Sequence, residues 1–347
     1  MNPWVLFILI ASLGLGTTIT FASSHWLLAW MGLEINTLAI IPLMAQHHHP
    51  RAVEATTKYF LAQAAAAAVI LFATTSNAWV MGEWQIQQLS HPMASTVTMI
   101  SLGMKIGLAP THLWLPEVLQ GLDLTTGLIL STWQKLAPMI LIYQLSPNVD
   151  PTILLLLGLT STLVGGWGGL NQTQLRKIMA YSSIAHMGWM MIVLKYSPEL
   201  MILNLMIYVI MTSTTFMTLK ALSATTINSL STMWTKTPAM VTIAMIIMLS
   251  LGGLPPLTGF MPKWMILQEM TKQNLPATAT ILALTALLSL FFYLRLCYNM
   301  TLTSTPNVIN NKSPWRLKMT IKTPLALMAI ISLAMLPVTP AAMALTL

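Results

Sequence analysis

Four ionisable side chains lie near the middle of long apolar stretches of the sequence, namely Glu34, Lys105, Lys135 and Lys263. A charge in hydrocarbon is costly, on a contested scale from about 2.5 kcal/mol upward, so such residues usually face a protein interior or a wet cavity. Burial disfavours the charged form of a lysine, whereas a nearby carboxylate favours it. A Glu34–Lys105 pair could therefore hold a proton and release it again. These residues indicate proton transfer along a chain of titratable groups.

Two other interpretations stay open for these four residues. The lysine stems could lie in lipid while their heads reach the interface, or the charges could form ion pairs that hold helices together. Lys220 and Arg295 lie nearer to the ends of apolar stretches, and we expect them to reach the interface in the first way.

The stretch from Met104 to Glu117 combines Lys105 with an interruption at Pro110. A broken helix is tolerated in a membrane only against protein or a wet cavity, so we expect this stretch to line a proton path. His112 lies in it and His186 lies in a later apolar stretch. An unperturbed pKa near 6.5 suits histidine for relaying or gating protons, and packing is the other interpretation.

Polar side chains that could hold water lie near Lys135 and His186, although serine and threonine in membrane helices mostly bond their own backbone. They are Thr125, Thr126, Ser131, Thr132, Gln134, Ser182 and Ser183. Several tryptophans are expected to be packing residues or interfacial anchors, namely Trp114, Trp133, Trp167, Trp189 and Trp264.

The composition predicts an all-α polytopic membrane protein. Of the 347 residues, 56% are hydrophobic and 7% are charged, against roughly 25% charged in a soluble domain. The net charge of +8 is spread along the chain rather than gathered into a patch that would suit nucleic acid.

The single cysteine, Cys297, excludes an intrachain disulfide. The sequence shows no CxxC, haem spacing or nucleotide loop, so we expect no cofactor and no metal in this chain. The triplet His47-His48-His49 is expected to be a solvated loop.

About eleven stretches meet the requirement of roughly 20 mostly apolar residues for a membrane span. They cover approximately 3–22, 26–45, 57–78, 93–121, 124–145, 151–170, 176–195, 199–222, 238–272, 276–302 and 323–345. Basic residues concentrate in the even-numbered loops and at their edges, namely Arg51, Lys58, Arg176, Lys177, Lys236, Lys312, Arg316, Lys318 and Lys322. The positive-inside rule then places the N-terminus on the basic side and the C-terminus opposite.

The fourth and ninth stretches are too long for one straight crossing, and each contains a proline interruption. We therefore predict two inverted five-helix units, 1–148 and 149–303, each with a broken fourth helix, followed by a basic loop and one further helix in 304–347. Paired broken helices in inverted repeats indicate a transport pathway. We find no residue-level similarity between the units, so this prediction depends on topology alone.

Three motifs resemble one family, the antiporter-like membrane subunits of respiratory complex I. Lys105 with Ala109–Glu117 is similar to the family's K…PFHxWxPD, Ser182–Gly188 to SSIAHxG, and Ser250–Phe260 with Lys263 to SLxGIPPxxGFxxK. The start at what would be the fourth span and the 28 methionines resemble the shortened form found in animal mitochondria. Thr111 stands where the family signature has phenylalanine, which puts the packing at the break in doubt.

The resemblance implies roles for the six candidates. Glu34 and Lys105 match the coupled pair of the first half-channel, Lys135 the central lysine, and Lys263 the lysine of the second broken helix. His112 and His186 match motif histidines. The resemblance also implies that the chain is a subunit of a proton-translocating NADH:ubiquinone reductase. The FMN, iron–sulfur clusters and ubiquinone of that enzyme would belong to partner subunits.

The implied surroundings are the mitochondrial inner membrane, with the N-terminus in the matrix and the C-terminus in the intermembrane space. The implied neighbours are the subunit 4L side, subunit 4, the lateral helix of subunit 5, accessory subunits and phospholipids including cardiolipin. Two alternatives remain, a cation/proton antiporter subunit and a structural arm segment that does not pump.

Overall fold

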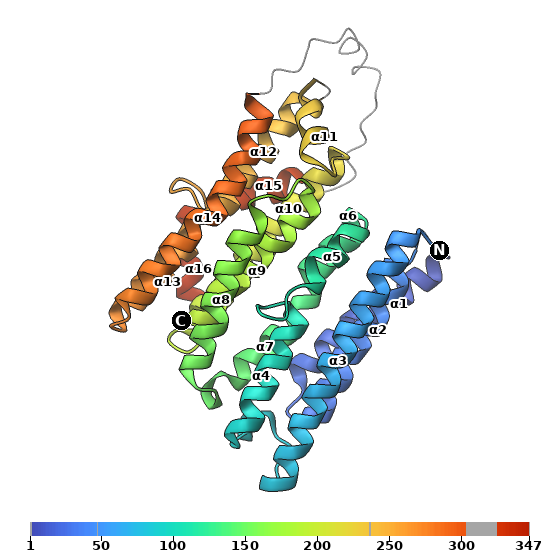
Figure 1. The fold of residues 1–347 in the computed structure, drawn as a ribbon, viewed down its shortest axis with the longest axis vertical. Coiled ribbons are helices and arrows are strands. Elements are labelled where there is room, and N and C mark those ends of the chain that lie inside the picture. The colour runs from blue at the N-terminus through green and yellow to red at the C-terminus, as the bar shows by residue number, and fades with distance from the viewer. Residues whose placement is uncertain (1, 47, 236, 303–324, 347) are drawn as a thin grey trace. The chain divides into compact units, whose positions relative to one another are not determined.

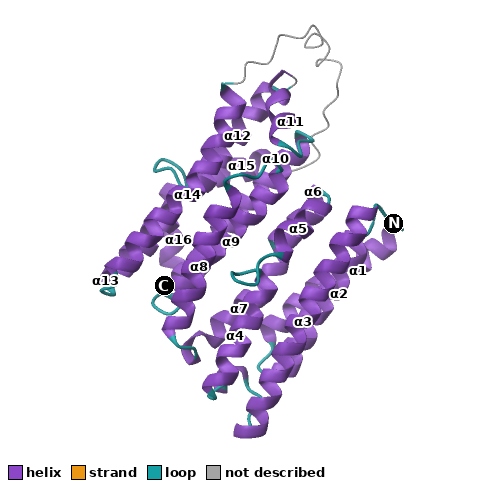
Figure 2. Cartoon of the chain, in the orientation of Figure 1, coloured by secondary structure: helices purple, strands orange, loops and turns teal. Residues whose placement is uncertain are grey.

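The computed structural model describes residues 2–46, 48–235, 237–302 and 325–346. Within these ranges the regular structure is helical, apart from two isolated β-bridges (Figures 1 and 2). The α-helices, which short 3₁₀ turns supplement, are α1 (Pro3–Ala22), α2 (Trp26–Met44), α3 (Pro50–Met81), α4 (Pro92–Ile106), α5 (Trp114–Gly121), α6 (Leu124–Ser131), α7 (Trp133–Leu145), α8 (Pro151–Gly169), α9 (Leu175–Val193), α10 (Pro198–Ala221), α11 (Ile227–Thr232), α12 (Pro238–Gly252), α13 (Phe260–Lys272), α14 (Pro276–Thr301), α15 (Leu325–Ala334) and α16 (Thr339–Thr346).

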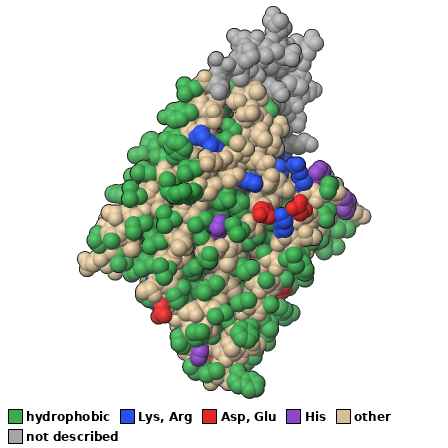
Figure 3. All heavy atoms as spheres, viewed as in Figure 1, with side chains coloured by type: hydrophobic (Ala, Val, Ile, Leu, Met, Phe, Trp, Pro, Cys, Tyr) green, Lys and Arg blue, Asp and Glu red, His purple; other side chains and the backbone are tan. Residues whose placement is uncertain are grey.

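Six of the described helices are long and apolar enough to cross a membrane, namely α1, α2, α3, α8, α10 and α14. Large hydrophobic side chains are exposed along them, for example Phe7, Phe72 and Leu284. Figure 3 shows hydrophobic side chains over much of the visible face, with charged side chains gathered in few places. This distribution is that of a protein whose solvent is lipid, and it confirms the predicted all-α membrane class.

Most helix ends lie close to the predicted limits, because prolines mark the first turns. Pro3, Pro50, Pro151 and Pro276 each begin a helix, where the missing N–H costs nothing. The side chain of Asn2 accepts a hydrogen bond from Trp4 N and so caps α1. His47 lies outside the described residues. So do five of the basic residues that were used to predict the sides of the loops, namely Lys236, Lys312, Arg316, Lys318 and Lys322.

Three sequence predictions of helix limits were wrong. Helix α3 begins at Pro50 rather than near 57, because His49 caps it and its polar first turns lie outside the apolar window. The stretch 124–145 is interrupted at Thr132, whose φ of −112° and ψ of −68° separate α6 from α7. The last stretch is also divided, because a 3₁₀ turn that contains Pro337 separates α15 from α16.

The chain divides into two units, residues 1–161 (unit 1) and 162–347 (unit 2). In unit 1, α2 packs against α1 and α3, α3 packs against α4 and α5, and α7 packs against α1, α2 and α4. In unit 2, α10 packs against α9, α12, α13 and α15, and α14 packs against α9, α12 and α13. The domain limits at 148 and 303 stay a prediction.

Both predicted breaks occur, and they share a residue pattern that the sequence analysis missed. Gly107-Leu108-Ala109-Pro110 follows α4, and Gly253-Leu254-Pro255-Pro256 follows α12. Gly107 and Gly253 have φ of 89° and 83°, a left-handed conformation that favours glycine. In each case the next leucine N–H bonds five residues back, to Gly103 O at 2.9 Å and to Leu249 O at 3.4 Å. This is the Schellman way of ending a helix, so the units are similar at residue level where they break.

Candidate proton path

Lys105 lies in the last turn of α4, where helix carbonyls lose their backbone partners. Two side chains from other helices donate to carbonyls of this turn. Gln63 Nε2 of α3 donates to Lys105 O at 3.2 Å, and Trp114 Nε1 of α5 donates to Met104 O at 3.0 Å. The ring of Tyr59 meets Trp114 edge-on at 5.7 Å. Trp114 is thus part of the break and not only the packing anchor that we predicted.

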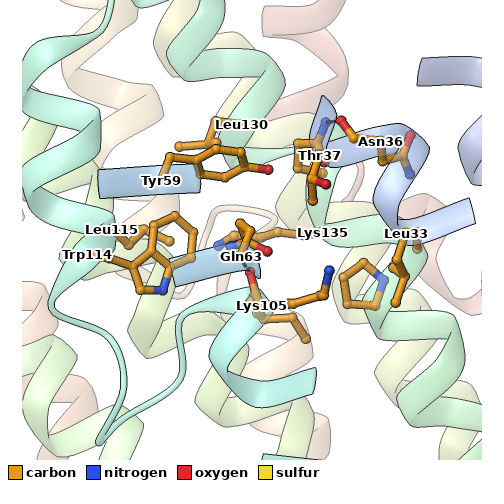
Figure 4. Close-up of a pocket in the computed structure, with 14 residues that line it drawn as sticks. Leu33, Asn36, Thr37, Tyr59, Gln63, Lys105, Trp114, Leu115, Leu130 and Lys135 are labelled. Carbon is orange, nitrogen blue, oxygen red and sulfur yellow. Dashed lines mark hydrogen bonds between the residues drawn. The ribbon is translucent and has the colours of Figure 1, made fainter. Parts of the chain in front are cut away.

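Lys105 and Lys135 line one cavity in unit 1, together with Asn36, Gln63 and Tyr59 (Figure 4). The cavity has about 20 Å³ open to the centre of a water molecule, and one water needs roughly 10–15 Å³ by that measure. The two lysines are only 6% and 3% exposed. Their heads therefore do not reach the surface of this chain, and the interfacial interpretation is wrong for both.

Several polar atoms in this cavity have no direct partner. Lys105 Nζ and both side-chain atoms of Asn36 are buried and make no hydrogen bond within the described residues. An unsatisfied buried polar group costs about 1–3 kcal/mol, and more if it is charged. Water is the usual remedy in a polar cavity of this size. The cavity is therefore suited to hydration.

Glu34 of α2 is half-buried, and its Oε2 accepts a hydrogen bond from Thr37 Oγ1 at 3.0 Å. It lies within electrostatic range of Lys105. No ion pair joins these two residues among the described side chains. The structure thus brings the predicted pair into electrostatic range without direct contact.

Lys263 and His186 line a second cavity, in unit 2, with about 10 Å³ open to the centre of a water molecule. Lys263 lies in the first turn of α13 and is half-buried, and its Nζ donates to Gly252 O at the end of α12, at 2.9 Å. His186 of α9 is 6% exposed and its ring lies 5.6 Å from that of Tyr208. Lys263 therefore donates to a carbonyl at the second break. At the first break, the side chains of Gln63 and Trp114 donate to carbonyls of the last helical turn in a similar way.

His112 does not line either cavity. It is half-buried between α4 and α5, and its Nδ1 lies 3.2 Å from Pro110 O. Thr111, the departure from the family signature, donates to Leu108 O at 3.2 Å. The break is closed by local hydrogen bonds at these positions, so His112 is placed to move with the break rather than to pass protons within a cavity.

Arg295 has partners within the chain. Its guanidinium donates to the carbonyls of Leu170 and Gln172, just after α8 ends. Lys220, by contrast, is exposed near the end of α10. Cationic donors near a helix C-terminus stabilise its unpaired carbonyls, and this explains why an arginine lies on α14.

Sequence reasoning missed Asn36, Gln63, Tyr59, Tyr208 and Tyr293 as neighbours of the ionisable residues. A signal did exist, because Gln63 interrupts a run of alanines and Asn36 follows Glu34 by two positions in an apolar stretch. The polar residues that we did single out mostly bond their own helix backbone. Ser131, Thr132, Ser182 and Ser183 each donate to a carbonyl three or four residues earlier.

Comparisons with known proteins identify the class. The family model described as NADH:quinone oxidoreductase/Mrp antiporter, TM, matches residues 23–289, and the one described as NADH dehydrogenase subunit 2 C-terminus matches residues 290–343. The fold is similar to a chain in respiratory complex I from Thermus thermophilus, with a TM-score of 0.86 and 25% identity, over 99% of this chain and 80% of that one. A chain of the Mrp complex from Dietzia sp. DQ12-45-1b has the same fold, with a TM-score of 0.84 and 15% identity, over 97% of this chain and 76% of that one.

The chain belongs to the family of NADH:quinone oxidoreductase and Mrp antiporter membrane subunits. Its curated relatives include NADH-ubiquinone oxidoreductase chain 2 of Carassius auratus, at 67% identity over 100% of both chains, and that of Formosania lacustris, at 68% over 99% of both. It is thus an integral membrane subunit of the proton-translocating complex I enzyme and works within a multi-subunit membrane complex.

Proposed function

We propose that Glu34, Lys105 and Lys135 carry protons through unit 1, and that Lys263 and His186 carry them through unit 2. The cavity of unit 1 is the observation that carries this proposal. Two buried lysines meet there, and Lys105 Nζ lacks a direct partner in the described part of the chain. An amine in such a place can exchange its proton with water while the surrounding helices keep lipid away.

The free energy of a pKa change in one lysine is comparable to the work of moving a proton across the membrane. One pKa unit corresponds to about 1.4 kcal/mol, and moving one charge against 100 mV costs roughly 2.3 kcal/mol. A change of about two pKa units in one lysine therefore matches the work of moving a proton across an energised membrane. Glu34 interacts electrostatically with Lys105 without an ion pair, so a movement of either side chain would change how tightly Lys105 holds its proton. His112 is assigned the role of gating the break.

Substitution of the first pair tests the proposal. Lys105→Met and Glu34→Gln are expected to slow coupled NADH oxidation and proton translocation by about 10²-fold, the usual loss for a removed proton-transfer group. The matched control is Lys220→Met, which changes an exposed lysine. The measurements are proton uptake per NADH in liposomes that contain the purified complex, and assembly on native gels. Normal pumping by an assembled Lys105→Met complex would contradict the proposal.

We infer the finer surroundings from the family likeness and the loop charges. The membrane is the mitochondrial inner membrane, with the N-terminus in the matrix and the C-terminus in the intermembrane space. The chain holds no cofactor or metal of its own, and FMN, iron–sulfur clusters and ubiquinone belong to its partners. Those partners are the subunit 4L side, subunit 4, the lateral helix of subunit 5 and accessory subunits, with phospholipids including cardiolipin at the lipid face. Co-purification and lipid mass spectrometry of the complex test these assignments.

A further inference from the structure

The second cavity contains a phenol that the proton path described so far does not use. Tyr293 of α14 is 1% exposed, and its hydroxyl is fully buried without a hydrogen bond in the described residues. The Ser182 hydroxyl interacts with it, but not in the geometry of a hydrogen bond. Buried tyrosine hydroxyls usually have a partner, so this one needs an explanation beyond packing.

The position of Tyr293 relates it to Lys263. Its ring packs on Gly252, where a Cβ atom would lie 3.6 Å from Tyr293 Cδ2. The carbonyl of the same Gly252 accepts the hydrogen bond from Lys263 Nζ. The base of the Tyr293 ring and the Lys263 amine therefore contact the same residue, the last of α12, and both side chains line the cavity that His186 also lines.

The other side of Tyr293 faces the polar residues of α9. Ser182 donates its own proton to Met179 O at 2.8 Å, so its oxygen can only accept from the phenol. The phenol of Tyr208 interacts with that of Tyr293 and with Ser183, and its ring lies beside His186. The cavity volume of about 10 Å³ is at the lower limit for one water molecule. The side chains of Tyr293, His186 and Lys263 thus line a space of about one water.

We propose that the Tyr293 hydroxyl is a proton-relay group of unit 2, between the Lys263 amine and the His186 imidazole. In the transfer an N–H bond of the Lys263 ammonium breaks, and an O–H bond forms at the phenol oxygen, directly or through one water. The original O–H bond of the phenol breaks as its proton passes to the imidazole nitrogen. The phenol ends neutral, the ammonium has become an amine, the imidazole has become an imidazolium, and nothing is oxidised or reduced. The inference rests on the proposed role of Lys263.

The variant Tyr293→Phe tests this relay, because it removes one oxygen and keeps the ring that packs on Gly252 and Phe292. The matched control is Tyr298→Phe, which makes the same change on the same helix at a tyrosine that is 56% exposed. In the purified complex in liposomes, we expect Tyr293→Phe to slow coupled proton translocation by about tenfold or more. We also expect it to raise the ratio of the rates in H₂O and D₂O, which a purely structural tyrosine would leave unchanged.

The outcomes separate the relay from the wider proposal. Lys263→Met, measured in parallel, tests the path of unit 2 itself. If Lys263→Met stops pumping while Tyr293→Phe pumps at the rate of Tyr298→Phe, the relay is wrong and the path stands. If Lys263→Met pumps normally, the path fails and the relay with it. If Tyr293→Phe does not assemble, Tyr293→His, which keeps a ring and restores a proton-exchanging group, must recover pumping, and a loss of pumping there overturns the relay.

Discussion

At the scale of single residues, the break at Lys105 depends on donors that replace lost backbone partners. Gln63 is 4% exposed and its amide donates to Lys105 O, so it holds the backbone from which the lysine side chain projects. Its chemistry is not interchangeable, because a lysine or arginine there would add a charge beside Lys105. The neutral amide satisfies the carbonyl and leaves the electrostatic field of Glu34 to act on the amine.

We expect Gln63→Leu to destabilise the subunit by about 1–3 kcal/mol, because it leaves the buried carbonyl of Lys105 without this donor. Thermal unfolding of the purified complex, followed by loss of coupled NADH oxidation, measures the effect. The control is Gln88→Leu, at an exposed glutamine of the same unit. Equal unfolding temperatures for the two variants would show that the Gln63 hydrogen bond contributes nothing measurable.

At the scale of helices, α2 brings Asn36 to the cavity of unit 1 at a place where α1 and α2 approach each other closely. A Cβ atom on Gly16 would lie 2.7 Å from Asn36 Oδ1 and 2.9 Å from Gly32 O. Small residues permit such close approach in membranes, where helix association depends on packing rather than on the hydrophobic effect. The pair of glycines therefore positions the polar face of α2.

Gly16→Ala is expected to cost about 1–3 kcal/mol, the usual range for overpacking, because both contacts fall below the normal distance. Gly14→Ala is the matched control, since a Cβ there meets nothing within 4 Å and alanine favours the helix. The resistance of the complex to dissociation by detergent, measured on native gels over a temperature series, compares the two. A Gly14→Ala complex less stable than the Gly16→Ala complex would refute this account of the contact.

At the scale of the whole molecule, the distribution of loop charges predicts which ends of the helices share a side of the membrane. The loop between α7 and α8 contains Asp150, and the loop after α10 contains Thr225. When the loops between the predicted spans are numbered along the chain, the loop with Asp150 is odd-numbered and acidic, and the loop with Thr225 is even-numbered. The positive-inside rule places them on opposite sides.

Single-cysteine labelling tests this arrangement with little background, because the one native cysteine, Cys297, is buried. Asp150→Cys and Thr225→Cys both place the thiol at exposed positions. A membrane-impermeant maleimide applied to sealed mitochondrial or bacterial membrane vesicles should label one variant, and in vesicles of opposite orientation it should label the other. Labelling of both variants from the same side would require a different number of crossings between residues 150 and 225.

The sequence predicted the helical class, most helix limits, both breaks and the ionisable residues near them. These features are local: apolar runs set the spans, prolines mark first turns, and Gly-Leu-x-Pro ends a helix in a left-handed glycine. The interruption at Thr132 was missed because neither an apolar window nor a proline marks it. The start of α3 at Pro50 was missed because the polar first turns of this helix lie outside the apolar window. The acceptors of Arg295, Leu170 and Gln172, were not predicted, because they lie far away along the chain.

By itself, then, the sequence predicted that charged residues lie at membrane depth and determined that two helices break, because apolar runs place the charges and prolines and glycines mark the breaks. Only the tertiary structure decided which groups meet. Lys105, Lys135 and Asn36, which line one cavity, come from α4, α7 and α2, and Lys263 and Tyr293, which line the other, come from α13 and α14. Cavities form between helices that are distant in the sequence, and side-chain packing decides which polar atoms stay without a partner.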